Sequence, residues 1–338
     1  MTLPAMPLSV LDLAPVSAGS TPQEALASTI ALAQHVEALG FTRFWVAEHH
    51  NMPGIASSAP SVLIAALGAA TSRIRLGSGG VMLPNHPPLV VAEQFGMLEN
   101  LYPGRIDLGI GRAPGTDQIT ARALRRSVDQ LSVDDFPDQL NDLMCFLQGE
   151  FPEGHPMAKI AAAPHPASMP QIWLLGSSGY SAQVAGILGL PFGFAHHFSA
   201  RNTLPALDLY RRSFQPSAVL DKPYAAIGVR MVIAESDERA EFLSGSSMLS
   251  FLRMATGRLG QLPSPEEAAA HPWTRQELEF VADRLDGQVI GSPETVERKL
   301  AELLEQTQVD ELMITTALHD PVERTTTLTR VSEMFAKS

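Results

Sequence analysis

Positive charge is scarce in this sequence of 338 residues. Lysine and arginine together number 24, against 36 aspartates and glutamates, so the formal net charge is −12 at pH 7. Such an excess of negative charge repels nucleic-acid phosphates and anionic lipid headgroups. We therefore expect neither a nucleic-acid partner nor binding to a membrane surface, although a small anion can still bind where positive side chains gather locally.

Cysteine and long apolar runs are also nearly missing. The single cysteine, Cys145, has no second thiol in the chain with which to form a disulfide, which is typical of a reducing compartment. No stretch reaches the roughly 18 consecutive apolar residues of a membrane-spanning helix, and the first residues lack the basic and apolar segments of a secretory signal. We expect a cytoplasmic protein.

Two nucleotide-binding fingerprints are absent as well. The chain contains no G-x-x-x-x-G-K-[ST] loop, and no G-x-G-x-x-G follows its first predicted strand. These motifs hold phosphates in P-loop and Rossmann domains. The sequence thus gives no sign of a nicotinamide-binding domain of its own.

What the sequence does contain is an alternation of short β-like segments with helical segments. Thr21 and Glu24 form a helix start, and Gly40 ends the same helix; Ser292 starts another helix by the same chemistry. The predicted strands are 8–13, 43–47, 73–77, 105–110, 171–175, 191–195, 226–234 and 311–315. The predicted helices are 22–39, 58–70, 90–101, 138–148, 179–189, 203–214, 322–335 and the one that begins at Ser292.

Eight strands that are each followed by a helix fit either a doubly wound sheet or a closed barrel. Polar residues and glycines gather directly after the predicted strands, and in a barrel these strand ends meet on one rim, where the active site forms. The sequence therefore predicts an α/β fold, an eight-stranded parallel βα barrel of the TIM type, as a single domain over residues 1–338.

Two segments interrupt the alternation, residues 112–137 and residues 235–288. The second follows the seventh predicted strand and carries helix starts at Ser264 and Thr274. We expect this second segment to overhang the barrel rim and to act as a mobile lid.

A turn of small residues joins the fifth predicted strand to the next helix. It reads Gly176-Ser177-Ser178-Gly179-Tyr180-Ser181, and free amides at a helix start stabilise an anion. An ordinary glycine–serine turn would have the same composition. Arg112 favours the anion site, because it follows the neighbouring fourth strand and a guanidinium binds phosphate bidentately. The pattern predicts a phosphate site without identifying the molecule.

The third predicted strand ends in Ser78-Gly79-Gly80. Bare backbone at a barrel mouth lets a flat ligand lie close to the chain. A simple glycine bend at the rim is the alternative interpretation.

Paired histidines follow two other strands, His49-His50 and His196-His197. Adjacent strand residues point to opposite faces, so one histidine of each pair turns inward and the other can be purely structural. His49, His86 and one of the later pair could form a three-nitrogen zinc site. Because the H-x-H spacing and an H-E-x-x-H helix are absent, we expect no metal and favour a general base or a ligand-contacting histidine.

Several segments in this order resemble the bacterial luciferase-like family of flavin-dependent monooxygenases, in particular its single-chain members related to alkanal monooxygenase. The similarity runs over nearly the whole chain apart from the two inserts. The segments are Phe44 to His50, Gly77 to Pro84, Pro87 to Gln94, Tyr102 to Arg112, Gly176 to Ser178 and Gly291 to Glu294.

The resemblance implies a barrel with FMN at its carboxyl-terminal rim. Arg112 and the turn after the fifth strand then hold the phosphate, and Gly79-Gly80 matches a non-proline cis peptide under the isoalloxazine ring. His49 matches a histidine that assists proton transfer, and Ala195 and His196 match the strand end beside the ring. The implied cofactor-binding residues are Ser78, Gly79, Gly80, Arg112, Gly176, Ser177, Ser178, Tyr180, Ser181 and His196.

Two positions depart from the luciferase pattern. Gly111 stands where luciferase has a reactive cysteine, and Gly176 replaces an acidic residue before the phosphate loop. We therefore do not expect light emission from long-chain aldehydes.

The function that the resemblance implies is that of an FMN-dependent monooxygenase. It would use reduced FMN, delivered by a separate flavin reductase, and O₂ to oxygenate a small organic substrate, for which an aldehyde-like molecule is one candidate. Three alternatives stay open at this point: a deazaflavin-dependent hydride-transfer enzyme, a non-catalytic flavin-binding protein and, last, a metal-dependent barrel hydrolase.

The resemblance also implies a homodimer formed through helices of the first half of the barrel. Small residues of the predicted helix 58–70 permit close packing against a second copy, or equally against the barrel itself. They are Ala65, Ala66, Gly68, Ala69 and Ala70.

Overall fold

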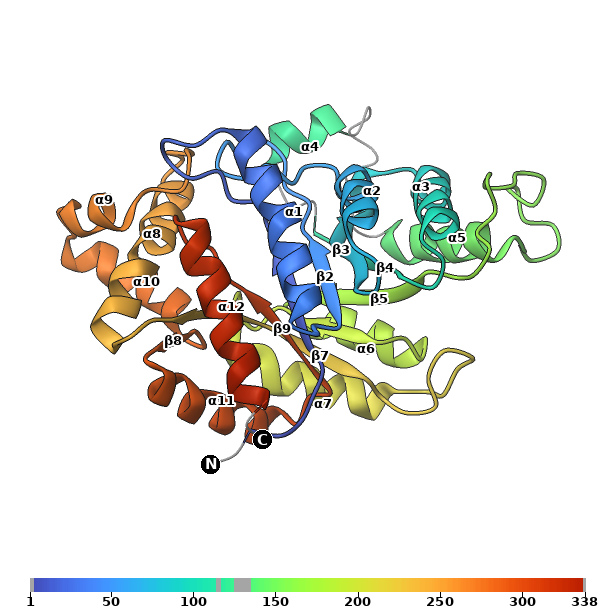
Figure 1. Cartoon of the computed structure of the whole chain (residues 1–338). Helices are drawn as coiled ribbons and strands as arrows, with labels where there is room; N and C mark the ends of the chain where they lie inside the picture. The colour runs from blue at the N-terminus through green and yellow to red at the C-terminus, as the bar shows by residue number, and fades with distance from the viewer. Residues whose placement is uncertain (1–2, 114–116, 125–134, 337–338) are drawn as a thin grey trace.

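The computed structural model describes residues 3–113, 117–124 and 135–336 (Figure 1). Residues 114–116 and 125–134 of the first predicted insert lie outside this description. In the described part, eight parallel strands form one closed ring, because β6 pairs with both β5 and β7. In ring order these strands are β1 (Leu8–Asp12), β2 (Arg43–Val46), β3 (Arg75–Met82), β4 (Ile106–Gly111), β5 (Gln171–Gly176), β6 (Phe192–Phe194), β7 (Ala225–Ile233) and β9 (Glu311–Thr315).

The closed ring confirms the barrel and excludes the doubly wound sheet. All eight strands lie where the alternation predicts them, within a few residues at each end. One further short strand, β8 (Val289–Gly291), was not predicted; it pairs in parallel with the end of β7 outside the ring. β3 extends further than expected and includes Gly79 and Gly80, with a register shift against β4 at that point.

Helices surround the barrel and carry the predicted starts. Thr21 and Glu24 form a reciprocal capping box, and Ser292, Ser264 and Thr274 each accept a backbone hydrogen bond at a helix start. The helices are α1 (Pro22–Ala38), α2 (Pro60–Ala70), α3 (Pro88–Leu101), α4 (Gln118–Leu124), α5 (Phe136–Gln148), α6 (Gly179–Ile187), α7 (Thr203–Ser213), α8 (Asp237–Ala255), α9 (Pro265–Ala270), α10 (Arg275–Leu285), α11 (Pro293–Thr307) and α12 (Pro321–Ala336), with short 3₁₀ turns at Leu83–Asn85 and Ala200–Asn202.

The main core lies between the strands and these helices. Outward strand residues such as Phe44, Leu76 and Ile227 pack there with buried helix residues, and Cys145 of α5 is buried as well. None of the described helices is long and apolar enough to cross a membrane.

Inside the barrel, the amino ends of the strands are closed by a buried network of charges. Arg43 donates from Nη1 to Asp107 Oδ2 at 2.8 Å and from Nε to Glu311 Oε1 at 3.0 Å. Arg75 Nη2 lies 2.6 Å from Asp107 Oδ1, and the Tyr224 hydroxyl donates to Glu311 Oε2 at 2.8 Å. Burial alone would lower the pKa of Arg43, but the two carboxylates raise it above its ordinary value, so this end stays charged and closed.

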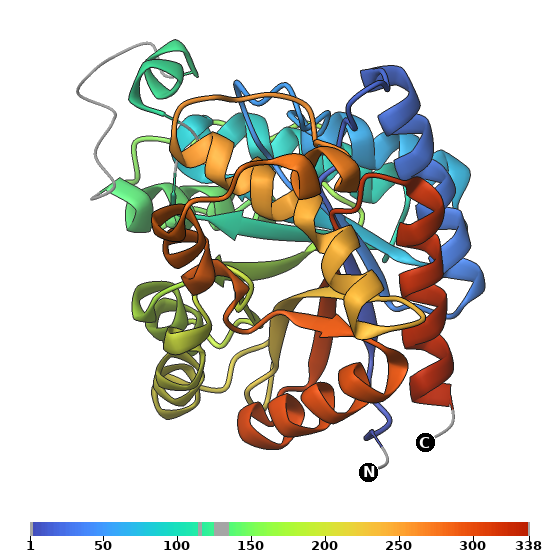
Figure 2. The same ribbon diagram turned by 90° about the vertical axis from the view of Figure 1, so that its left-hand side faces the viewer.

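The insert after β7 lies at the other end of the barrel. In Figure 2 the helices α8, α9 and α10 (orange) lie in front of the strands, and the chain then returns through β8 to α11. Side chains of α8 and α10 line a cavity together with residues that follow β1 and β2. The insert therefore covers the carboxyl ends of the strands, where the sequence places the candidate site residues.

The charge network leads to a prediction about stability. Asp107→Ala removes the carboxylate that buried Arg43 shares with half-buried Arg75, and breaking a buried ion pair typically costs about 3–5 kcal/mol of unfolding free energy. Urea denaturation followed by tryptophan fluorescence measures this loss. The control is Arg275→Ala, which removes an exposed pair with Glu279 and should leave the midpoint almost unchanged. Equal midpoints for the two variants would contradict a structural role for the network.

Candidate active site

The wall between β3 and β4 consists of bare backbone near the open end of the barrel. The Gly79–Gly80 peptide bond is cis, as the resemblance implies. A Cβ atom on Gly80 would lie 2.7 Å from the Gly109 carbonyl oxygen, and one on Gly109 only 2.1 Å from the Ser78 oxygen. Side chains are therefore excluded from this part of the wall. The Ser78 hydroxyl donates to the Gly109 carbonyl at 2.9 Å, so it serves the wall itself.

Arg112 and the predicted phosphate turn lie together at the ends of the paired strands β4 and β5. The guanidinium carbon of Arg112 is 4.2 Å from the centre of the Tyr180 ring, in the first turn of α6. The N-cap of α6, Ser178, makes no side-chain hydrogen bond to that turn, so the Ser178 hydroxyl does not occupy its amides. The cationic head group and a helix start thus face the same place, as an anion site requires.

Gly176 is needed for the packing of this turn. A Cβ atom there would lie 2.8 Å from Cβ of Ser181 and 2.9 Å from its hydroxyl oxygen. Ser181 is buried, whereas Ser177 and Ser178 are exposed at the tip of the turn. The exposed pair is therefore accessible to a bound group, while Ser181 supports the turn from below.

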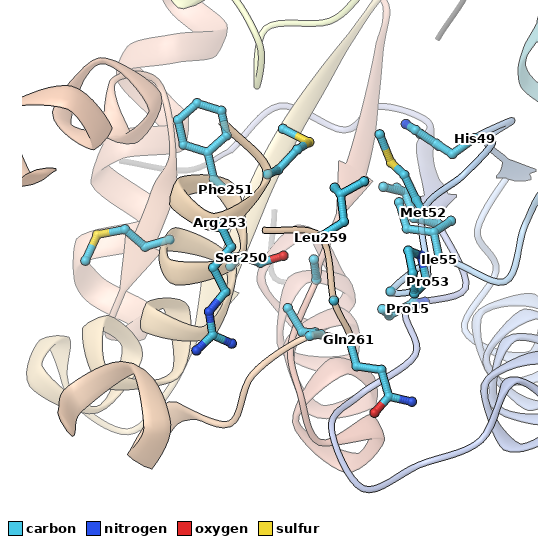
Figure 3. Close-up of a pocket in the computed structure, with 18 of the residues that line it drawn as sticks. Pro15, His49, Met52, Pro53, Ile55, Ser250, Phe251, Arg253, Leu259 and Gln261 are labelled. Atoms are coloured by element: carbon cyan, nitrogen blue, oxygen red, sulfur yellow. The ribbon is translucent and has the colours of Figure 1, made fainter. Parts of the chain in front are cut away.

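His49 points into the cavity under the insert, where it lies beside Met52 in Figure 3. Its Nδ1 is buried and has no hydrogen-bond partner among the described residues. Burial lowers the pKa of His49 below the ordinary 6.5, and the nearby negative charge of Glu48 opposes this shift only in part. The imidazole is therefore neutral at pH 7 and can accept a proton.

Glu48 and His50, on either side of His49 in the sequence, belong to a hydrogen-bonded cluster that the sequence did not predict. Buried Glu48 accepts hydrogen bonds from His50 Nε2 and His86 Nε2, both at 2.8 Å, and from the Met82 amide at 3.0 Å. Burial alone would raise the pKa of Glu48, but the bonds from His86 and His50 lower it. The cluster ties the segment after β2 to the end of β3 and so positions the cavity wall that bears His49.

The cluster around Glu48 differs from the three histidines that the sequence suggested as a possible zinc site, namely His49, His86 and one of the later pair. Within the described ranges, the one group of three clustered potential metal ligands is Glu48, His50 and His86, and His49 is not part of it. The spacing of two between Glu48 and His50 puts both on one side of an extended chain, which is the sequence signal that would have indicated the pair. Their mutual hydrogen bonds account for the cluster as a structural network.

The second histidine pair also divides its roles. His196 is buried with Nδ1 2.7 Å from the Thr203 hydroxyl, and its ring packs against Gly287 at the end of the insert. His197 lines the cavity instead, and its Nδ1 donates to the Gly228 carbonyl at 2.9 Å. The structure thus places His197 in the cavity wall, and the role of His196 beside a flavin ring stays a prediction.

Apolar side chains make up most of the remaining cavity wall. They come from the loop after β2, where Met52, Pro53 and Ile55 lie on one side in Figure 3, and from the insert, where Phe251 lies on the other side and Leu259 between the two. The cavity therefore suits a small organic molecule held next to His49.

Comparison with known proteins identifies the family. The family model described as luciferase-like monooxygenase matches residues 6–311. The chain belongs to this family. This monooxygenase is 45% identical over 320 residues to the luciferase-like monooxygenase of Escherichia coli strain K12, covering 95% of this chain and 94% of the relative. It is 35% identical over 320 residues to the N-acetyl-S-alkylcysteine monooxygenase of Bacillus subtilis, covering 94% of each chain.

Solved structures agree with this assignment. Apo-MsnO8 superimposes with a TM-score of 0.90 at 37% identity, covering 98% of this chain and 99% of that one. The oxygenating constituent of 3,6-diketocamphane monooxygenase from Pseudomonas putida, solved in complex with FMN, shares the fold with a TM-score of 0.71 at 20% identity and 99% coverage of both chains. The protein is therefore an oxidoreductase built on the luciferase-like barrel.

The lowered pKa of His49 can be measured directly. A proton NMR titration of the imidazole resonances, with His49→Ala to assign the His49 signal, should give a midpoint below 6.5. Because the folded state then binds fewer protons than the unfolded state near that pH, His49 should also make the protein more stable as the pH rises from 5 to 7. A midpoint at or above 6.5 would show that Glu48, rather than burial, dominates.

Proposed function

We propose that this monooxygenase binds FMN, with the phosphate at Arg112 and the ring against the bare backbone at Gly79-Gly80. The stacking of the Arg112 guanidinium on Tyr180, beside the uncapped start of α6, is the observation that carries the proposal. A phosphate dianion is stabilised by a guanidinium and by helix-start amides together. The glycines of β3 and β4 carry no side chains of their own, and the apolar side chain of Leu175 lies against Gly80 and Gly109. A flat ring would therefore meet backbone and an apolar side chain here, and these residues fit the cofactor.

Reduced FMN supplies two electrons, so that one atom of O₂ enters the substrate and the other leaves as water. The protein's part is to shield this chemistry and to handle protons. We infer that α8 and α10 act as a lid that keeps water out of the cavity. Neutral His49 is placed to accept a proton from a group held in the cavity and to return it later.

The same proposal includes a separate reductase as the source of reduced flavin. The chain lacks both nucleotide-binding fingerprints that would point to a nicotinamide site.

The substrate is a small organic molecule. An aldehyde fits the resemblance to alkanal monooxygenases, and an organic sulfide is the class named for the relative from B. subtilis.

The phosphate assignment has a sharp test. Arg112→Ala should weaken FMN binding by about tenfold to a hundredfold, the value of a charge-assisted contact, and leave riboflavin binding nearly unchanged because riboflavin has no phosphate. Flavin fluorescence quenching measures both constants. Arg122→Ala, which removes an exposed arginine of α4, controls for the loss of charge.

Equal weakening of FMN and riboflavin by Arg112→Ala would contradict the phosphate assignment. A wild-type protein that binds neither oxidised nor reduced FMN would overturn the proposed function. A side-by-side titration with a deazaflavin separates the remaining flavin alternative, which requires tighter binding of the deazaflavin than of FMN.

We also propose a homodimer through α2 and α3, which pack against each other. Gly68 cannot take part, because a Cβ atom there would collide with the Tyr102 ring, so this glycine packs against Tyr102 at the end of α3. Each helix carries a stripe of exposed apolar residues at helical spacing: Val62, Ala66 and Ala69 on α2, and Val90, Met97 and Leu101 on α3. Because exposed apolar patches mark interfaces, these two stripes suit contact with a second copy of the chain.

The dimer is tested by light scattering after size-exclusion chromatography. The wild-type protein should run as a dimer, and Val62→Asp combined with Met97→Asp should give a monomer, because two buried charges would face each other across the interface. Val322→Asp on α12, also at an exposed valine, should stay dimeric. A monomeric wild-type protein would refute this interface.

A further inference from the structure

Phe136, the first residue of α5, contacts the turn after β5 and has no part in the function derived so far. Its side chain is only 2% exposed. The centre of its ring lies 6.3 Å from the centre of the Tyr180 ring, and the two ring planes are tilted by 67°. This separation and tilt are those of an edge-to-face aromatic pair. A residue at the end of the first insert therefore packs against the proposed phosphate site.

The half-buried ring of Tyr180 connects Phe136 to Arg112. The guanidinium carbon of Arg112 is 4.2 Å from the centre of this ring, a distance at which a cation is attracted to the face of an aromatic ring. Tyr180 also packs against the main core, to which Phe136 belongs. The buried Phe136 thus helps to set the plane of the Tyr180 ring, and that plane sets where the guanidinium of Arg112 lies.

The position of Arg112 matters because an arginine side chain is long and has many rotamers. Ordering such a side chain on a ligand costs free energy, and binding is tighter when the side chain is already held in its bound position. Stacking on Tyr180 restricts the guanidinium before any anion arrives. The affinity of this site for a phosphate therefore depends on the ring beneath Arg112.

The helix that bears Phe136 is a firm support for this ring. The buried face of α5 continues from Phe136 through Leu140, Leu143 and Leu147, and the helix packs against α3. It ends at Gly149 in the left-handed conformation, with φ of 76°. Phe136 is therefore held by the body of the barrel and not by the exposed tip of the turn after β5.

We propose that Phe136 is a positioning residue for the cofactor phosphate. Its ring holds Tyr180, and Tyr180 holds Arg112 in the orientation that binds phosphate. The proposal rests on the proposed function, because it takes Arg112 as the ligand of the FMN phosphate. Phe136 then contributes to the preference of the protein for FMN over riboflavin, although it acts only through Tyr180.

The experiment measures the binding of FMN and of riboflavin by flavin fluorescence quenching. The wild-type protein is compared with Phe136→Leu and Phe136→Met, which remove the ring and keep an apolar side chain in the core. Both variants should bind FMN about threefold to tenfold more weakly, the value of an aromatic pair, and riboflavin within about twofold of the wild type. Phe136→Tyr keeps the ring and should retain most of the affinity for FMN.

A double-mutant cycle shows whether Phe136 acts through Arg112. In a protein that already carries Arg112→Ala, the change Phe136→Leu should alter FMN binding by less than about twofold, because no guanidinium is left to position. A loss of FMN affinity as large as in the wild-type background overturns the proposal.

Phe146→Leu is the matched control, because Phe146 is also a phenylalanine of α5 with 2% exposure. Its ring makes an edge-to-face pair with Phe151, with the ring centres 4.9 Å apart. This variant should lower the urea midpoint about as much as Phe136→Leu and leave FMN binding within about twofold. An equal loss of FMN affinity in the two variants means that a loosened core is the cause, and it overturns the proposal.

The remaining outcomes separate this proposal from the proposed function. Wild-type protein that binds no FMN overturns both. If Arg112→Ala weakens FMN selectively but Phe136→Leu and Phe136→Met bind FMN as the wild type does, the phosphate site stands and the positioning role of Phe136 is refuted. Equal weakening of FMN and riboflavin by these two variants also refutes it, because riboflavin has no phosphate for Arg112 to bind.

Discussion

Arg43 and the two carboxylates that it joins, Asp107 and Glu311, determine which end of the barrel is open. A charge inside a protein is tolerated only when it is paired and hydrogen-bonded, and this network meets that requirement with residues from the starts of several strands. Above it, Trp45 and Trp173 pack edge to face with ring centres 5.2 Å apart. The lower half of the barrel is therefore solid, and any ligand has to enter at the carboxyl ends of the strands.

That open end is divided between two kinds of surface. On β3 and β4, glycines leave the wall without side chains, and Arg112 with the start of α6 supplies positive charge at the edge. On the side of β1, β2 and β7, the insert closes over an apolar cavity that holds His49 and Arg230. One region thus suits a flat phosphorylated molecule and the other a smaller organic one, with a neutral imidazole in the wall of the second.

Most of the fold followed from local patterns in the chain. Helix starts such as Thr21 with Glu24, and strands separated by amphipathic segments, act over a few residues and can be recognised without knowledge of the rest. The order of eight such units then leaves few architectures. The short strand β8 escaped this reasoning, because a three-residue strand has no periodicity of its own and forms only where β7 extends past the barrel.

For the site, the sequence identified the candidate residues, but it did not show which other residues they contact. Alternation along a strand separates His49 from Glu48 and His50, and strand order brings Arg112 to the turn before α6. The contact between Arg43 and Glu311 spans 268 positions, and the choice of His197 over His196 for the cavity depends on Thr203 and Gly287. Local order in a chain sets which chemical groups are present and on which face they lie. Packing between distant segments sets which groups meet, how deeply they are buried and hence what charge they carry.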